Sequence, residues 1–418
     1  MRSSRAILGL LALLLATGAA WAQGDFYLKD GDRVVFYGDS ITDQRLYTTY
    51  AETYVVTRFP ALHVTFVHSG VGGDRVTGGG AGPIDVRLPR DVFAYKPTVI
   101  TIMLGMNDGG YRAFDAKIFN TYSTGYQHMI DSIKSALPGV RATLIQPSPY
   151  DDVTRPAGFE GGYNAVLVRY GQFVKELAQK EKLDVADLNA SIVAALEKAK
   201  ATDAKTAEKI IGDRVHPGPG GHLLMAEALL KAWNAPALVT SVEIDADKVQ
   251  TVRVENTAVS DLKESNGLAW TQSDKALPMP LNLKDPAMKL AIQSSDFLQA
   301  LDWQPLKVTG LKGQRYQLKI DSEEVRTFTR PQLEEGVNLA DLSTPMAKQA
   351  QAVHDLTLKH NNVHFTRWRE LQVPLAQQSL PHLSQAIEAL DNLEADLVAQ
   401  QRQAAQPKPR HYELLLQE

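Results

Sequence analysis

Short apolar runs alternate with longer segments of helical period along the first half of the chain. The runs are rich in β-branched and aromatic side chains, as expected of buried strands, and lie at residues 33–37, 63–68, 98–104, 142–146 and 183–186. The segments between them have apolar residues spaced by three and four and lie at 47–58, 116–137 and 165–182. Strands that alternate with helices predict an α/β fold of three layers, with a central parallel sheet covered by helices on both faces.

The end of this first unit is marked by a helix expected from about Gly221 to Trp233. Ala235-Pro236 breaks the pattern after it, which places a domain boundary near residue 240. Residues 23–240 are therefore predicted to form one domain. Residues 241–418 are predicted to be a C-terminal extension of short strands followed by helices.

Within the extension, residues 239–254 and 305–326 have the pattern of short strands, with a hairpin-like turn at 308–313. Residues 344–401 are expected to be mostly helical, with breaks at Pro374 and Pro381. The stretch 383–401 has too few heptads for a coiled coil, so a helix lying against the body is expected. The tail 403–410, rich in Gln, Ala, Pro and Lys, is expected to be loosely ordered.

The first 22 residues have the three parts of a secretory signal. Arg2 and Arg5 give a basic start, an apolar run reaches Leu15, and Ala20-Trp21-Ala22 supplies a small-residue cleavage site. The run is shorter than the roughly 18 residues that a membrane anchor needs. Cleavage after Ala22 and a secreted or periplasmic protein without stable membrane insertion are predicted.

Composition narrows the chemistry further. The chain has no cysteine, which excludes disulfides, a thiolate nucleophile and cysteine-ligated metal. Loss of Arg2 and Arg5 with the signal changes the formal charge from −4 to −6, which argues against a nucleic-acid partner.

Three polar residues could form a nucleophile and its base. Ser40 follows the first run in Gly38-Asp39-Ser40, and a serine hydroxyl needs a neighbouring base, usually histidine, to take its proton. Asp213 precedes His216 by three positions, so it can hold Nδ1 of the ring while Nε2 faces the serine. Alone, each motif has a plainer interpretation as a turn or helix cap.

Acyl transfer also needs hydrogen-bond donors for the oxyanion. Two glycine-containing loops follow the second and third apolar runs and can supply them. The loop at 70–74 would offer the N–H of Gly73, and Gly105-Met106-Asn107-Asp108 would offer the side-chain amide of Asn107. The first loop could instead cradle a phosphate, but no Gly-Lys-Ser/Thr follows it.

These four blocks, in this order, resemble those of the SGNH (GDSL-like) hydrolase family, and the match covers about residues 33–233. The resemblance implies a flavodoxin-like fold in which Ser40 attacks an ester carbonyl, His216 is its base and Asp213 holds the imidazole. It also implies an oxyanion hole of Ser40, Gly73 and Asn107, with no metal or other cofactor. The α/β-hydrolase alternative is set aside, because no Gly-x-Ser-x-Gly surrounds Ser40.

The resemblance predicts an exported esterase for short acyl groups, acetyl above all, on a small-molecule or polysaccharide substrate. A lipase, lysophospholipase or thioesterase would use the same residues, and a non-catalytic glycan-binding or scaffold protein is the alternative from another class.

Several further polar residues have plainer interpretations. His68 and His222 are expected to be packing residues, and Asp151-Asp152 is expected to be a solvated turn. Arg75, Tyr111 and Arg112 follow the oxyanion loops and could line a substrate groove, but exposed Arg and Tyr are common.

Overall fold

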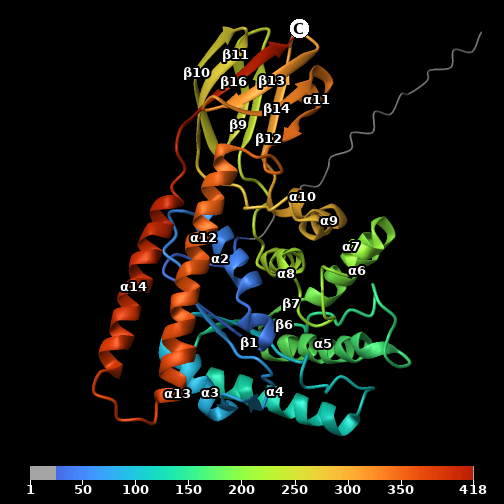
Figure 1. Ribbon diagram of the computed structural model, residues 1–418, viewed down its shortest axis with the longest axis vertical. Coiled ribbons are helices and arrows are strands. Elements are labelled where there is room, and N and C mark those ends of the chain that lie inside the picture. Colours follow the sequence, from blue (N-terminus) through green and yellow to red (C-terminus); the bar gives the residue numbers. More distant parts are fainter. Residues whose placement is uncertain (1–24, 418) are drawn as a thin grey trace, which may run out of the picture.

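A parallel five-stranded sheet forms the centre of the first half of the chain (Figure 1). The computed structural model describes residues 25–417. The strand order is β2-β1-β5-β6-β7, which is 2-1-3-4-5 along the chain and confirms the predicted doubly wound fold. The strands are β1 (Arg33–Gly38), β2 (Thr65–Gly70), β5 (Val99–Met103), β6 (Arg141–Ile145) and β7 (Asp184–Ala186).

Helices cover both faces of this sheet, with α2 and α8 on one side and α4 and α5 on the other (Figure 1). Their starts follow ordinary capping chemistry: the carboxylate of Asp115 accepts from the backbone N–H groups of Lys117 and Ile118 where α4 begins. The helices are α1 (Ser40–Asp43), α2 (Leu46–Arg58), α3 (Ile84–Asp91), α4 (Ala116–Ala136), α5 (Gly162–Glu181), α6 (Leu188–Thr202), α7 (Ala204–Ala207) and α8 (Pro219–Ala232). A short 3-10 turn (Phe93–Tyr95) and the paired β3 (Gly78–Gly79) and β4 (Gly82–Pro83) complete this half.

The extension contains a β-sandwich, seen at the top of Figure 1. One sheet has the order β10-β11-β16-β13-β14 and the other β15-β12-β8-β9, and side chains of both, such as Trp270 and Val308, share one apolar core. The strands are β8 (Ser241–Asp245), β9 (Gln250–Glu255), β10 (Thr257–Ser265), β11 (Gly267–Asp274), β12 (Pro305–Thr309), β13 (Arg315–Ile320), β14 (Glu323–Thr329), β15 (Val337–Asn338) and β16 (Arg410–Gln417). The smaller helices of the extension are α11 (Arg330–Glu335), which packs on the sandwich, and α9 (Pro286–Ser294) and α10 (Phe297–Leu301), which pack against α8 and join the core of the first half.

Three predictions about the extension are corrected. Strands do not simply precede helices, because β16 returns after them to the middle of the larger sheet, between β11 and β13. Residues 308–313 do not form a hairpin turn, because β12 and β13 belong to different sheets and buried Leu311 turns into the core between them. The tail 403–410 is ordered, since the Gln406 amide donates to Pro60 O and Arg410 already begins β16.

Two long helices form a hairpin that runs from the sandwich down along the half that contains the parallel sheet (Figure 1). They are α12 (Pro345–Phe365) and α14 (Leu383–Ala404), joined through a π-helical segment (Thr366–Gln372) and α13 (Val373–Leu375). The first helical run ends one residue beyond Pro374, and Pro381 lies in the following turn. As expected, α14 lies against the body: Arg402 donates to the carbonyl groups of Leu62 and Val64.

The hairpin explains why α2 is buried along almost its whole length. Its residues from Tyr47 to Arg58 are all buried, because α8 covers one side and α12 the other. Polar side chains on the α12 side are paired: Asn361 Nδ2 donates to Thr49 Oγ1 at 3.1 Å, and Thr53 Oγ1 lies 3.0 Å from His354 Nδ1. The two halves therefore share one buried interface.

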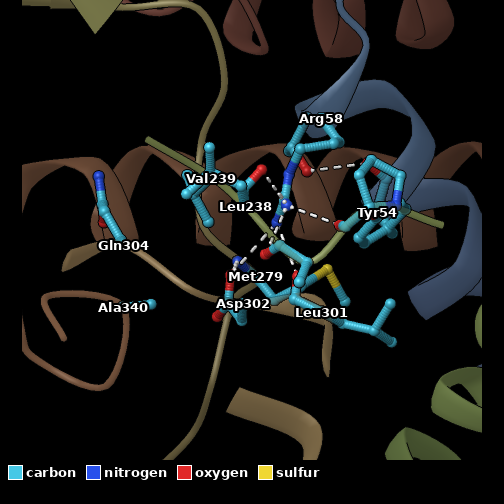
Figure 2. A network of polar contacts seen from close by, with 12 residues as sticks. Tyr54, Arg58, Leu238, Val239, Met279, Leu301, Asp302, Gln304 and Ala340 are labelled. Atoms are coloured by element: carbon cyan, nitrogen blue, oxygen red, sulfur yellow. Dashed lines mark hydrogen bonds and ion pairs between the residues drawn. The ribbon is translucent and has the colours of Figure 1, made fainter. Parts of the chain in front are cut away.

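A second junction is built around Arg58 at the end of α2 (Figure 2). Its guanidinium donates to Leu238 O at 2.8 Å and to Leu301 O at 2.9 Å, and it lies 3.4 Å from Asp302 Oδ1. Asp302 in turn accepts from Met279 N. One side chain thus connects the half with the parallel sheet to the segments that lead into the sandwich.

The predicted signal, residues 1–22, lies outside the described residues. From residue 25 to 417, no helix combines the length and apolar character needed to cross a membrane.

Candidate active site

Ser40 lies where the first strand meets a helix. β1 ends at Gly38, and Ser40 is the first residue of α1, with Asp39 as its N-cap. The turn is tight: a Cβ on Gly38 would come 2.8 Å from Met103 O, so glycine is required here. Because Ser40 is in the first helical turn, its N–H has no acceptor within the helix and can serve a substrate oxygen.

The structure brings Ser40, His216 and Asp213 together. His216 Nε2 lies 2.8 Å from Ser40 Oγ, although the two residues are 176 positions apart. His216 Nδ1 lies 2.7 Å from Asp213 Oδ2. The geometry is that of a serine nucleophile, a general base and a carboxylate that orients the base.

Asp213 acts on its own loop and on His216, not on the following helix. α8 begins at Pro219 with Gly218 as its N-cap and without a side-chain cap, which excludes the helix-cap interpretation. Asp213 Oδ1 accepts from the N–H groups of Val215 and His216 at 2.9 and 2.7 Å. Partial burial works to raise the pKa of Asp213, but these N–H groups and the imidazole outweigh it and hold the pKa below its usual range.

Gly73 and Asn107, the residues predicted to donate to the oxyanion beside Ser40, lie on loops that contact each other. Gly73 has φ +75°, a left-handed conformation that favours glycine, and the turn is closed by Asp74 N donating to Val71 O. Asn107 Nδ2 donates to Asp74 O at 3.1 Å. This bond uses one amide hydrogen, so the other can serve a substrate oxygen.

Two buried carboxyl groups support these loops. Asp39 Oδ1 accepts from Ile41 N, and Asp108 Oδ1 accepts from Val76 N at 3.0 Å. Burial raises the pKa of each carboxyl group to about 7. The carboxyl groups of Asp39 and Asp108 therefore hold the Ser40 turn and the Asn107 loop in place without two full negative charges next to the site.

Asp151 and Arg155 hold the loop that carries Asp213, a contact that the sequence did not predict. The expectation that Asp151 lies in a solvated turn was wrong: Asp151 is fully buried and pairs with Arg155 at 2.9 Å. Arg155 also donates to the carbonyl groups of Ile211 and Gly212, and Asp151 N donates to Arg214 O. The signal was present, because this loop leaves the same edge of the sheet as Ser40.

Tyr111 also belongs to the site. Its hydroxyl donates to Asn107 Oδ1 at 2.9 Å, and together with the bond from Asn107 Nδ2 to Asp74 O this fixes the orientation of the amide. The ring is 45% exposed and lies beside Tyr150 and Tyr163, with centroid distances of 6.2 and 5.0 Å. An aromatic surface therefore borders the catalytic residues.

His68 and His222 are packing residues, as predicted. His68 is buried against Thr48 Oγ1 at 2.7 Å. His222 is buried with Nε2 2.8 Å from Gln44 Oε1 and Nδ1 accepting from Tyr47 N, and burial lowers its pKa to about 3, so the ring binds a proton too weakly to act as a second base near pH 7. In the part of the chain that the structure describes, no group of three or more His, Asp or Glu side chains is arranged to hold a metal ion.

Comparisons with known proteins find relatives of the first half of the chain. The profile of the GDSL-like lipase/acylhydrolase family matches residues 36–224. An acetylxylan esterase of Geobacillus stearothermophilus is 24% identical over 223 residues, which are 49% of this chain and 94% of that protein. A crystal structure of an acetylxylan esterase from the same organism aligns with 50% of this chain and 96% of its own, at 22% identity and a TM-score of 0.41.

One solved structure resembles almost the whole chain, including the extension. A gut microbial diltiazem-metabolizing enzyme matches with a TM-score of 0.81 and 26% identity, over 93% of this chain and 98% of its own. Over residues 36–224 the chain thus resembles the GDSL-like lipase/acylhydrolase family, and the protein is an ester hydrolase.

Proposed function

We propose that this enzyme is an exported serine esterase that removes short acyl groups, acetyl above all, from carbohydrates. The observation that carries the proposal is the unbroken line of contacts from Ser40 Oγ to His216 Nε2, and from His216 Nδ1 to Asp213 Oδ2. Ser40 begins α1 after the first strand, and Asp213 and His216 share the loop before α8, so the fold brings two distant segments together.

In the proposed mechanism, His216 takes the Ser40 proton while Oγ attacks the ester carbonyl. The carbonyl oxygen becomes an oxyanion that the N–H groups of Ser40, Gly73 and Asn107 stabilise. His216 then gives the proton to the departing alkoxide, which leaves an acyl-Ser40 ester. Water, deprotonated by His216, attacks that ester and releases the acid while Ser40 regains its proton. The ionised Asp213 stabilises the imidazolium in both steps.

Two observations support a carbohydrate ester as substrate. The side chains of His216 and Asp213 are 35% and 60% exposed, so the catalytic residues are accessible to an acyl group on a bulky polymer. Tyr111 offers an exposed ring beside Asn107, on which the apolar face of a sugar could stack. The likeness to an acetylxylan esterase points to the same class of substrate.

Export is proposed from the sequence of residues 1–22. Expression of the full chain in a Gram-negative host tests it. A periplasmic product whose N-terminus is Gln23 supports export, and an uncleaved cytoplasmic product would refute it.

The esterase proposal is tested by hydrolysis of p-nitrophenyl esters of increasing acyl length, followed by release of acetate from acetylated xylan. Ser40→Ala removes the nucleophile, and Ser191→Ala, at an exposed position on α6, is a matched control. We expect acetyl ester turnover to fall with chain length, to vanish in Ser40→Ala and to persist in Ser191→Ala. An optimum at long acyl chains would replace the carbohydrate substrate by a lipid, and full activity of Ser40→Ala would refute the serine mechanism.

A further inference from the structure

The end of the helical hairpin contacts the catalytic half close to the oxyanion loops. α12 ends at Phe365 and continues as the π-helical segment, which contains Trp368. π-Helical turns are rare and often occur at functional sites. Phe365 and Trp368 each begin a chain of contacts that ends in the loop at 70–74.

The contacts that begin at Trp368 pass through two acidic residues and one arginine. Its indole Nε1 donates to Asp91 Oδ1 at 2.7 Å, and Trp368 is 1% exposed. Asp91 pairs with Arg87 one turn earlier on α3. The fully buried Arg87 donates through Nε and Nη2 to Asp74 Oδ2, at 2.9 and 2.7 Å. An indole from the extension is thus linked to the carboxylate of Asp74 by buried hydrogen bonds.

Asp74 is where these contacts meet the catalytic machinery. Its backbone N–H closes the turn that contains Gly73, and its backbone carbonyl accepts from Asn107 Nδ2 at 3.1 Å. A shift of Asp74 would therefore move two of the three proposed oxyanion donors together. The buried ion pair between the Arg87 guanidinium and the Asp74 carboxylate opposes that shift.

The contacts that begin at Phe365 reach the other end of the same loop. The Arg45 guanidinium lies 4.1 Å from the centre of the Phe365 ring and donates to Asp43 O at 2.6 Å. Asp43 Oδ2 accepts from Gly72 N at 3.2 Å. The loop is thus held at Gly72 and at Asp74 by residues that the hairpin contacts.

We propose that the hairpin end is a positioning element for the oxyanion hole, with Trp368 and Phe365 as its positioning residues. The inference rests on the proposed serine mechanism and assigns the extension a role in turnover. Neither side chain is required to touch the substrate. Each acts through the loop at 70–74, whose Gly73 N–H must meet an oxygen that becomes negatively charged only in the transition state.

This role predicts a specific kinetic signature. Oxyanion donors must lie about 2.7–3.1 Å from the developing charge, and a displacement of roughly 1 Å can cost about a hundredfold in rate. The ester in its ground state depends little on these donors. Loosening the hairpin contact should therefore lower kcat and leave KM nearly unchanged.

The test is Trp368→Phe in the full chain, which removes the indole N–H and keeps an aromatic ring. Trp270→Phe is the matched control, because Trp270 is also fully buried and also donates its indole N–H, to Gln272 in the sandwich. Active sites are counted by the end-point release of p-nitrophenol from a phosphonate ester. kcat and KM for p-nitrophenyl acetate are then expressed per active site, and thermal unfolding is measured for each variant.

We expect Trp368→Phe to lower kcat per active site roughly ten- to hundredfold, with KM within about twofold of the wild type. Trp270→Phe should lower the melting temperature and keep kcat per active site. Phe365→Leu, at a partly exposed position, gives a second measurement even if Trp368→Phe folds poorly, and it should also lower kcat.

An unchanged kcat per active site in Trp368→Phe, or in Phe365→Leu if Trp368→Phe does not fold, would overturn the inference. So would an equal loss in Trp270→Phe. Ser40→Ala separates this outcome from a failure of the proposed function: if Ser40→Ala is inactive while the hairpin variants keep full turnover, only the positioning role is wrong.

Discussion

His360 Nε2 of α12 lies 2.6 Å from Glu52 Oε1 of α2, although the two residues are 308 positions apart. Both side chains are buried, and Glu52 also contacts His68. On the other side of the ring, His360 Nδ1 lies 3.8 Å from Glu394 of α14, and His364 lies 3.4 Å from the same carboxylate. The hairpin is thus attached to the catalytic half through buried groups that change charge with pH.

The first prediction concerns stability at alkaline pH. Burial works to lower the pKa of His360, but Glu52 and Glu394 outweigh it and raise the pKa to about 9, above the value of 6.5 for an exposed histidine. The contribution of His360 is therefore fully present below pH 6.5 and is lost as the pH rises through about 9. Between pH 7.5 and 10 the free energy of unfolding should fall by about 2 kcal/mol through this residue.

Chemical denaturation at pH 7.5 and 10 measures this loss, and His360→Gln should remove it. His354→Gln is the control, because burial lowers the pKa of His354 to about 4 and the ring is neutral across this range. Equal pH dependence in the wild type and His360→Gln would contradict the prediction.

A second prediction concerns the junction around Arg58 (Figure 2). Arg58→Lys should lower the free energy of unfolding by about 3 kcal/mol. An ammonium group cannot donate to all the carbonyl groups that the planar guanidinium binds, and the substitution leaves Asp302 buried without its guanidinium partner. Urea denaturation followed by circular dichroism measures the change.

Arg253→Lys gives the comparison for this substitution. Arg253 pairs with Glu255 on the surface, where the same exchange should change stability by less than about 0.5 kcal/mol. If Arg58→Lys stayed as stable as Arg253→Lys, the junction would not depend on the guanidinium.

The catalytic half of the fold could be predicted because its signals are local. Each strand of the parallel sheet matches an apolar run to within a few residues, and the doubly wound rule then places the ends of β1, β2 and β5 at one edge. Ser40, Gly73 and Asn107 follow those three strands, and the structure places them there. Their roles stay predictions until the variants are measured.

The interface with the hairpin could not be predicted, because it depends on contacts between distant parts of the chain. Helical periodicity marks an apolar face on α2, but it does not show that α12 covers Thr49, Glu52 and Thr53. Asp151 gave a misleading signal for a similar reason: two acidic residues after a proline are typical of a solvated turn, and only the fold brings Arg155 and the loop before Asp213 around it.

The last prediction concerns that loop. Arg155 donates to the carbonyl groups of Glu208, Ile211 and Gly212, and all three bonds are 2.8–3.0 Å long. A lysine is a point charge with three donors and cannot reach all these acceptors together. Arg155→Lys should therefore loosen the segment before Asp213 and tilt His216 away from Ser40, which should lower kcat about tenfold with little change in KM.

Arg141→Lys is the matched control, because Arg141 lies at the start of β6, pairs with Asp32 and is remote from the catalytic edge of the sheet. It should alter stability and keep kcat. Arg155→Lys with wild-type kcat would show that the Asp213 loop holds its geometry alone. A loss of kcat in Arg155→Lys alone would identify Arg155, in the loop after β6, as the support of the general base, because its guanidinium holds the backbone of the segment before Asp213 and does not need to touch substrate.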